Sequence, residues 1–276
     1  MTGFSGTGFS GTGFSGRRVG AMVLRHLYIL KGSWPRLIEM AYWPIVNMVV
    51  WGFTSRFFQG HSDWVARASG VLIGAVILWD VMFRGNLGVS LSFIEEMWSR
   101  NLGHLSVSPL RPHELVASMV AMSVIRTVIG VLPAALLAIP LYHFSIFSLG
   151  LPLLTFWLNL MVTGWAIGLG VSALVLRFGL GAESLAWVLV FAVAPVAGIY
   201  YPVAVLPHWL QAVAWALPPA YVFEGMRAVM FGQGLRLDLL LGAAGLNLAY
   251  LLATTLVFLR TLHVARQRGL LLNVGE

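Results

Sequence analysis

The chain has 276 residues, of which 59% are hydrophobic and 10% are charged, and it contains no cysteine. Soluble globular domains carry about 25% charged residues, so this composition indicates a membrane protein, and the lack of cysteine excludes disulfides, thiolate nucleophiles and thiolate metal sites. The formal net charge of +7 would suit a nucleic-acid partner, but in a membrane protein the distribution of basic residues first reports topology.

The N-terminal region divides into a repeat and an amphipathic segment. Residues 1–16 contain three tandem copies of TGFSG, and because Gly and Ser at this density cannot build a core, we predict a flexible tail. No cleavable signal peptide is expected, since the apolar stretch that follows lacks a small-residue cleavage site. Residues 17–31 place apolar side chains on one helical face and Arg18 and Arg25 on another, which predicts a helix lying on the membrane surface.

Six apolar segments follow, and a helix needs about 20 such residues to cross a bilayer. They are residues 35–57, 68–93, 115–142, 151–176, 184–200 and 237–260. We therefore predict an all-α membrane protein with six transmembrane helices. Its transmembrane domain covers residues 17–262, and residues 263–276 form a cytoplasmic C-terminal tail.

The basic residues predict the orientation. Six spans put both termini on one side, and if that side is cytoplasmic, only Arg56, Arg67, Arg227 and Arg236 fall outside, with Arg84 and Arg126 left within spans. This asymmetry satisfies the positive-inside rule. We therefore predict an integral protein of the bacterial inner membrane with membrane lipid around it, both termini cytoplasmic, and no nucleic-acid partner.

Lysine and histidine usage limits the chemistry of this chain. Lys31 is the only lysine, and Gly32 follows it, whereas a phosphate-binding loop needs Lys followed by Ser or Thr. If ATP and Mg are used, another subunit must therefore bind them, and we expect no cofactor here. The seven histidines show no metal-ligand spacing, so we predict no metal site and no catalytic residues.

Residues 94–114, IEEMWSRNLGHLSVSPLRPHE, form a polar island between two apolar segments. Glu95 and Glu96 open it, and Trp98, Leu102 and Leu105 make an apolar edge at helical spacing. Pro109 and Pro112 break any helix and stiffen the return to the third span. The pattern fits a short amphipathic helix that docks into a partner's groove, or alternatively an ordered polar loop.

Two ionisable residues lie inside the second span. Asp80 and Arg84 stand four residues apart, close enough along one helix face to pair. They either line a translocation path for a polar substrate or form an internal ion pair, since ionisable residues in spans usually face a bundle interior or a cavity. Arg126 in the third span either joins this cluster or extends toward the interface.

Residues 184–223 carry no charge and are too long for one span. Prolines divide the excess into short pieces, which predicts a re-entrant helical hairpin on the outer side, because irregular backbone is tolerated there only when buried in protein or lining a cavity. The alternative is an ordinary aromatic belt. The candidate outer gate comprises Tyr201, Pro202, Pro207, Trp209, Trp215, Tyr221, Glu224 and Arg227.

These segments carry a family resemblance. EEMWSRNLGHLSVSPLRPHE resembles the acidic coupling segment of ABC type-2 transporter permeases, the membrane subunits of ATP-binding-cassette exporters, and YYPVAVLPHWLQAVAWALPPAYVFEGMR is similar to their segment before the last span. The resemblance covers residues 17–262 and implies a cytoplasmic coupling helix near residues 94–106. It also implies a permease dimer, most simply a homodimer, on two ATPase subunits. The residues that would contact the ATPase or set the elbow are Glu95, Glu96, Trp98, Arg100, Leu102, Leu105, Arg111 and Glu114.

The function expected from this resemblance is that of a permease subunit that moves a substrate outward and has no nucleotide site of its own. An ion-coupled secondary transporter is the main alternative, but it needs intramembrane acids, and Asp80 is the only central one. An intramembrane lipid-modifying enzyme would need clustered His, Asp or Glu at one depth, and the sequence contains no such cluster. Nothing in the sequence identifies the substrate.

Overall fold

The computed structural model of the chain describes residues 13–59 and 63–268, and in these residues the secondary structure is helical, with no strand. The predicted tail at residues 1–16 and the predicted tail at residues 263–276 therefore lie largely outside the described residues. In chain order the elements are α1 (Gly16–Lys31), α2 (Trp34–Gln59), α3 (Asp63–Trp98), α4 (Leu102–Val107), α5 (Pro112–Tyr142), η1 (Ile146–Leu149), α6 (Leu151–Phe178), η2 (Leu180–Ala182), α7 (Leu185–Val193), η3 (Val203–Val205), α8 (His208–Trp215), α9 (Pro218–Met230) and α10 (Leu237–Gln267).

Four of the described helices are long and apolar enough to cross a membrane. They are Gly70–Trp98 within α3, Pro112–Tyr142 (α5), Leu151–Phe178 (α6) and Leu237–Gln267 (α10). Each has at least the 20 or so residues that a hydrocarbon core of about 30 Å requires. The prediction of an all-α integral membrane protein is confirmed for the described residues.

The other two predicted spans differ from these four. α2 has 26 residues, but it contains Arg36, Glu39 and Arg56 and is not among the membrane-grade helices. α7 ends at Val193 after nine residues instead of continuing to residue 200. The reason is local: Pro195 has no N–H to continue the helix, and Gly198 adopts a positive φ of 67° that redirects the chain. The count of six spans stays a prediction.

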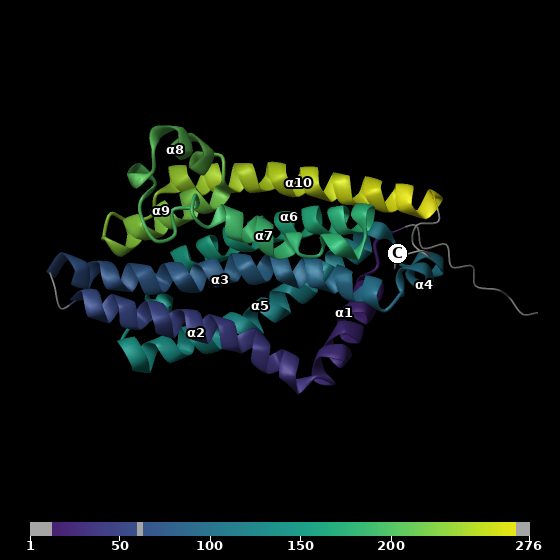
Figure 1. Cartoon of the computed structure of the whole chain (residues 1–276), viewed down its shortest axis with the longest axis horizontal. Coiled ribbons are helices and arrows are strands. Elements are labelled where there is room, and N and C mark those ends of the chain that lie inside the picture. Colours follow the sequence, from purple (N-terminus) through teal and green to yellow (C-terminus); the bar gives the residue numbers. More distant parts are fainter. Residues whose placement is uncertain (1–12, 60–62, 269–276) are drawn as a thin grey trace, which may run out of the picture.

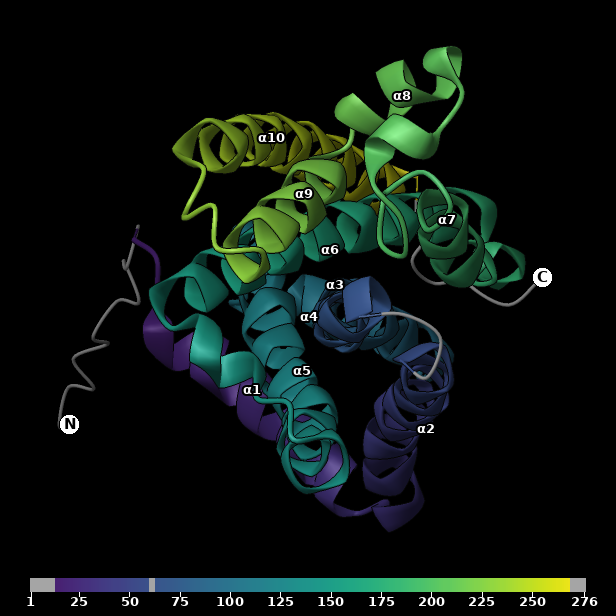
Figure 2. The same ribbon diagram turned by 90° about the vertical axis from the view of Figure 1, so that its left-hand side faces the viewer.

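The long helices run side by side, with α4 at one end of the bundle and α8 and α9 at the other (Figure 1). α1 lies crosswise to them, as the two views show (Figures 1 and 2). That orientation suits a helix at a membrane surface, although its place in the interface stays a prediction. The described N-terminal residues and the end of α10 both lie toward the α4 end.

α3 is the central helix of the bundle. It packs against α2, α5 and α6 (Figure 2), and 83% of its most apolar window is buried, against 11% for α10. Glycines of α6 allow α6 and α3 to approach each other closely. A Cβ added at Gly164 would lie 2.6 Å from the Met82 carbonyl oxygen of α3, and one at Gly168 would lie 2.8 Å from the Asn86 carbonyl oxygen. Small residues four apart are a common device for packing membrane helices backbone to backbone.

We expect Gly164→Ala to destabilise the protein by about 1–3 kcal/mol, the usual cost of overpacking, because the facing atoms are backbone and cannot move aside cheaply. Thermal unfolding in detergent measures the effect. The matched control is Gly245→Ala in α10, where an added Cβ meets nothing within 4 Å. Equal unfolding temperatures for the two variants would contradict this account of the α3–α6 contact.

Candidate functional site

The predicted coupling helix is divided in the structure. α3 continues through Trp98, and α4 starts only at Leu102, so Glu95 and Glu96 belong to the end of the second predicted span. Arg100 breaks the helix, since it has a positive φ of 52° that a non-glycine residue adopts at a turn. The prediction of one helix over residues 94–106 was wrong in its boundaries, because no Gly or Pro marks this break in the sequence.

Glu95 lies between two arginines from different helices. Its Oε2 is 2.8 Å from Arg126 Nη2 of α5, and its Oε1 is 3.4 Å from Arg36 Nη1 of α2. Arg126 thus extends from within its span toward the α4 end, which was one of the two predicted alternatives. The carboxylate joins α2, α3 and α5 at this end of the bundle.

Glu96 is buried and is held by α1. Arg25 forms an ion pair with its Oε1, His26 Nε2 lies 3.5 Å from the same oxygen, and Asn101 Nδ2 donates a hydrogen bond of 2.7 Å to Oε2. Glu96 is only 1% exposed to solvent. The acid therefore anchors the crosswise helix to the end of α3.

Glu114 fastens the start of α5 to the start of α1. Arg18 donates two hydrogen bonds to its carboxylate, 2.8 Å from Nε to Oε2 and 2.6 Å from Nη2 to Oε1. The backbone N–H groups of Ser15 and Arg111 donate to the same side chain at 2.8 and 3.0 Å. Four hydrogen bonds to this fully buried carboxylate hold the elbow before α5 against α1.

The side chains that remain exposed here form what we call the tip surface: Trp98, Ser99, Arg100, His104 and Val107. Trp98 is 51% exposed and Val107 is 87% exposed, whereas Leu102 is 2% exposed and Leu105 is half-buried. A partner docked on this surface would touch Trp98 and Arg100 but not Glu96 or Leu102. Of the predicted partner-contact residues, Trp98 and Arg100 are therefore exposed, whereas Glu96 and Leu102 are buried.

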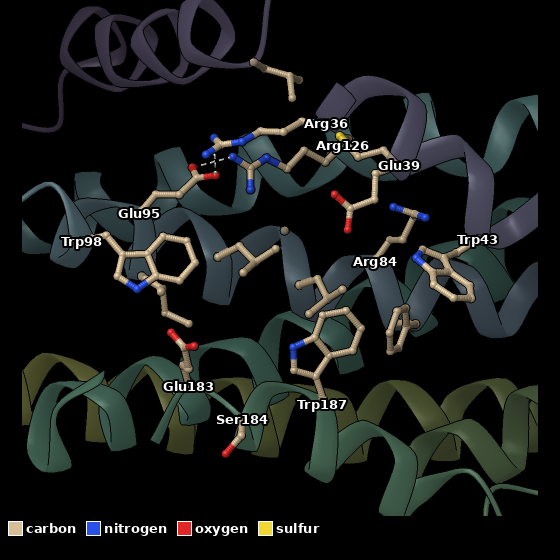
Figure 3. A pocket seen from close by; sticks show the side chains of 17 residues that line it. Arg36, Glu39, Trp43, Arg84, Glu95, Trp98, Arg126, Glu183, Ser184 and Trp187 are labelled. Carbon is tan, nitrogen blue, oxygen red and sulfur yellow. Dashed lines mark hydrogen bonds and ion pairs between the residues drawn. The ribbon is translucent and has the colours of Figure 1, made fainter. Parts of the chain in front are cut away.

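A cavity of about 500 Å³ lies beside this end, walled by residues of α1, α2, α3, α5 and α7 and of the segment before α7 (Figure 3). We call it the α2–α7 cavity. Its charged lining residues are Arg36, Glu39, Arg84, Glu95, Arg126 and Glu183, and its aromatic ones are Trp43, Phe83, Trp98 and Trp187. Trp98 belongs to both the cavity and the tip surface, so the two features are physically continuous.

No ion pair joins Asp80 and Arg84 in the structure, although the charge of Asp80 acts on Arg84. Asp80 Oδ1 accepts a hydrogen bond of 3.5 Å from Asn47 Nδ2 of α2. Arg84 instead crosses Gly130 of α5, where an added Cβ would lie 2.5 Å from its Nε. The i, i+4 spacing predicted a pair, but each side chain finds a different neighbouring helix. Of the two, only Arg84 lines the α2–α7 cavity.

The outer segment forms two short helices at the opposite end, and neither the eight residues of α8 nor the 13 of α9 could cross a membrane. Arg227 and Glu224 of α9 form hydrogen bonds with the preceding loop. Pro202 and Pro207 immediately precede η3 and α8, Trp209 is 72% exposed, and Trp215 packs edge-on to Tyr221 with ring centroids 4.9 Å apart. The hydroxyl of Tyr201 donates to the Pro195 carbonyl. Re-entry into the bilayer stays a prediction.

Several functional candidates were missed from the sequence. Arg18, Arg25 and Arg36 pair with the predicted acids, and Glu39, Trp43, Glu183 and Trp187 line the cavity. One signal was available: Arg18 and Arg25 are seven residues, two helical turns, apart on the polar face of α1. No group of three His, Cys, Asp or Glu side chains able to hold a metal ion occurs in residues 13–59 and 63–268.

A family model described as ABC-2 type transporter matches residues 27–231, well over half of the 276 residues. The matched region runs from within α1 through α9 and contains the α2–α7 cavity and the tip surface. No curated protein matches the chain.

Proposed function

The chain belongs to the ABC-2 type transporter family, and we propose that it is the permease subunit of an exporter driven by separate ATPase subunits. Members of this family generally work with an ATP-binding subunit. The match describes a transport component and not a catalytic one, and the match includes no nucleotide-binding domain. ATP and Mg are accordingly bound by the partner in this proposal.

The observation that carries the proposal is the continuity of the tip surface with the α2–α7 cavity through Trp98. An ATPase docked on the tip surface pushes on α4 and on the end of α3, and α3 carries Arg84 and Phe83 in the cavity wall. Binding energy at one site can act at another only through an element with two arrangements. The break at Arg100 and the rigid elbow at Glu114 make the segment between them suitable as that element.

A second copy of the chain completes the path in this proposal. Exposed aromatic side chains flank the cavity on α2 and α7: Tyr42 is 53% exposed, Trp43 is 52%, Trp187 is 43% and Phe191 is 57%. The α8–α9 segment then lies at the outer exit, opposite the tip surface. Two permeases and two ATPases form the complete exporter of the bacterial inner membrane, with both termini cytoplasmic.

The test is co-expression with an ATP-binding-cassette ATPase from the same source, followed by purification through the permease and measurement of Mg-ATP hydrolysis in lipid nanodiscs. We expect a stoichiometric complex whose hydrolysis depends on the permease. A permease that reconstitutes as an active ion-driven carrier without any ATPase would overturn the proposal in favour of a secondary transporter.

We expect Val107→Asp to weaken the complex by at least thirtyfold, because a charge at the centre of a docked apolar contact costs about 2 kcal/mol or more. Val107 is 87% exposed, so the permease itself should fold normally. Pull-down of the ATPase and the hydrolysis rate measure the effect. The matched control is Val205→Asp, which changes a valine 70% exposed at the opposite end. If both variants bind the ATPase as the wild type does, the tip surface is not the docking site.

A further inference from the structure

The α2–α7 cavity combines Arg84, which forms no ion pair among the described residues, with an apolar wall. We infer that it binds an anionic amphiphile, with Arg84 holding the acidic head group and Phe83, Leu87, Trp43 and Trp187 packing on the hydrocarbon chain. The inference rests on the proposed function, because it names the chemical class of the substrate that the permease takes up. A cavity of about 500 Å³ is within the usual range of about 300–1,000 Å³ for small-molecule sites, which suits a single hydrocarbon chain.

Arg84 is the central residue of this site. It lies in the middle of the membrane-grade segment Gly70–Trp98, about 20 Å from each end at 1.5 Å per residue. The residue is 8% exposed, its Nε is buried without a hydrogen-bond partner, and no ion pair involving Arg84 occurs among the described residues. A cation at that depth is costly unless it serves a site or finds a partner.

None of the acids around Arg84 forms an ion pair with it. Asp80 accepts from Asn47 through Oδ1 while its Oδ2 is buried without a partner, and its charge acts on Arg84 from outside the cavity lining. Glu95 is shared by Arg36 and Arg126. Glu39 of α2 points toward Arg84 in Figure 3, but it is exposed and forms no ion pair with it. Glu183 lines the opposite wall beside Trp98 and Trp187. The guanidinium therefore retains donors for a ligand, and Glu39 competes with that ligand for them.

The fold makes room for this arginine. Gly130 of α5 lies directly beneath it, and an added Cβ there would also lie 2.8 Å from the Met40 carbonyl of α2. A guanidinium presents paired N–H donors that match the oxygens of a phosphate or a carboxylate. The shared ligand chemistry is thus an acidic head group on a hydrocarbon chain, found both in single-chain amphiphiles and in anionic membrane lipids.

The experiment measures binding of radiolabelled dodecyl phosphate to the purified full-length chain in maltoside micelles. We expect the wild type to prefer it at least tenfold over dodecyltrimethylammonium, and Arg84→Gln to bind it about ten- to a hundredfold more weakly, the factor for lost charge-assisted hydrogen bonds. Arg84→Lys should recover part of the affinity, and Glu39→Gln should bind more tightly. The matched control, Arg260→Gln, changes an exposed arginine of α10 outside the cavity and should bind as the wild type does.

Two competition measurements distinguish the possible sources of the ligand. Inorganic phosphate should not compete at equal concentration, because it lacks the chain, and phosphatidic acid in nanodiscs should compete only if a membrane lipid is the natural occupant. Equal wild-type binding of the two oppositely charged amphiphiles overturns the inference even if Arg84→Gln fails to fold, and unchanged affinity in a folded Arg84→Gln overturns it as well. Neither result bears on ATPase assembly, which is measured separately and tests the proposed function alone.

Discussion

Replacing Glu96 with alanine is expected to destabilise the protein by about 3 kcal/mol, the low end of the loss for a buried ion pair, because Glu96 is buried but the side chain of Arg25 is 36% exposed. The change leaves Arg25 without its acid and Asn101 without an acceptor beneath the crosswise helix α1. α1 should then separate from the end of α3. Thermal and denaturant unfolding in detergent measure the loss, with fluorescence-detected size exclusion reporting the folded fraction.

The control for Glu96 is Asp238→Ala at the opposite end of the bundle. Asp238 pairs with Arg236, but both side chains are more than half exposed, so its loss should change stability little. A double-mutant cycle with Arg25→Ala adds a second check, because the two changes share one interaction and should not be additive. Additive effects, or a Glu96→Ala variant as stable as the control, would show that this pair does not hold α1.

The two acids at the start of the polar island form contacts within the chain. From the sequence, Glu95 and Glu96 were expected to contact the ATPase. In the structure both carboxylates bind arginines of the same chain. Lysine at these positions would therefore disrupt the permease itself, and Val107→Asp separates docking from folding more cleanly.

Local rules predicted much of the fold. Apolar length located the four membrane-grade helices, and prolines located the elbow before α5 and the short pieces of the outer segment. The break at Arg100 was not predictable, because Arg100 adopts a positive φ although no Gly or Pro stands at the break. For α7, Pro195 was a visible stop signal, but the lack of charge in residues 184–223 favoured a longer span.

The direction of a side chain around a helix was the weakest part of the sequence-based prediction. Arg84 and Asp80 were correctly placed within a span, yet the glycine that admits Arg84 lies in α5, 46 positions later in the chain. The cavity is also formed by residues far apart in the sequence, since its walls come from five helices and from the residues just before α7. These residues come together only in the folded chain, so no local sequence pattern could predict their contacts.

The outer segment is held by a buried arginine. Arg227 of α9 donates to the carbonyl oxygens of Gly198 and Ile199 at 2.6 and 3.4 Å, and it pairs with Glu224 at 3.1 Å. Glu224 in turn accepts the N–H of Val203 at 2.6 Å. The loop after α7 is therefore tied to α9 by charge-assisted hydrogen bonds. If this segment is a gate, it opens as one piece with α9 or by breaking these bonds.

Arg227→Met separates the two possibilities, because it keeps much of the side-chain bulk and removes every donor. We expect a loss of about 3 kcal/mol, typical of breaking a buried pair, and amide hydrogen exchange in residues 196–206 faster by on the order of a hundredfold, the equivalent factor. Arg236→Met, which removes an exposed pair at the same end, should leave that exchange unchanged. Exchange that rises equally in α9 would mean that the segment and the helix open together. Exchange unaltered in the loop would mean that packing of Val203 and Leu206, and not Arg227, keeps the segment in place.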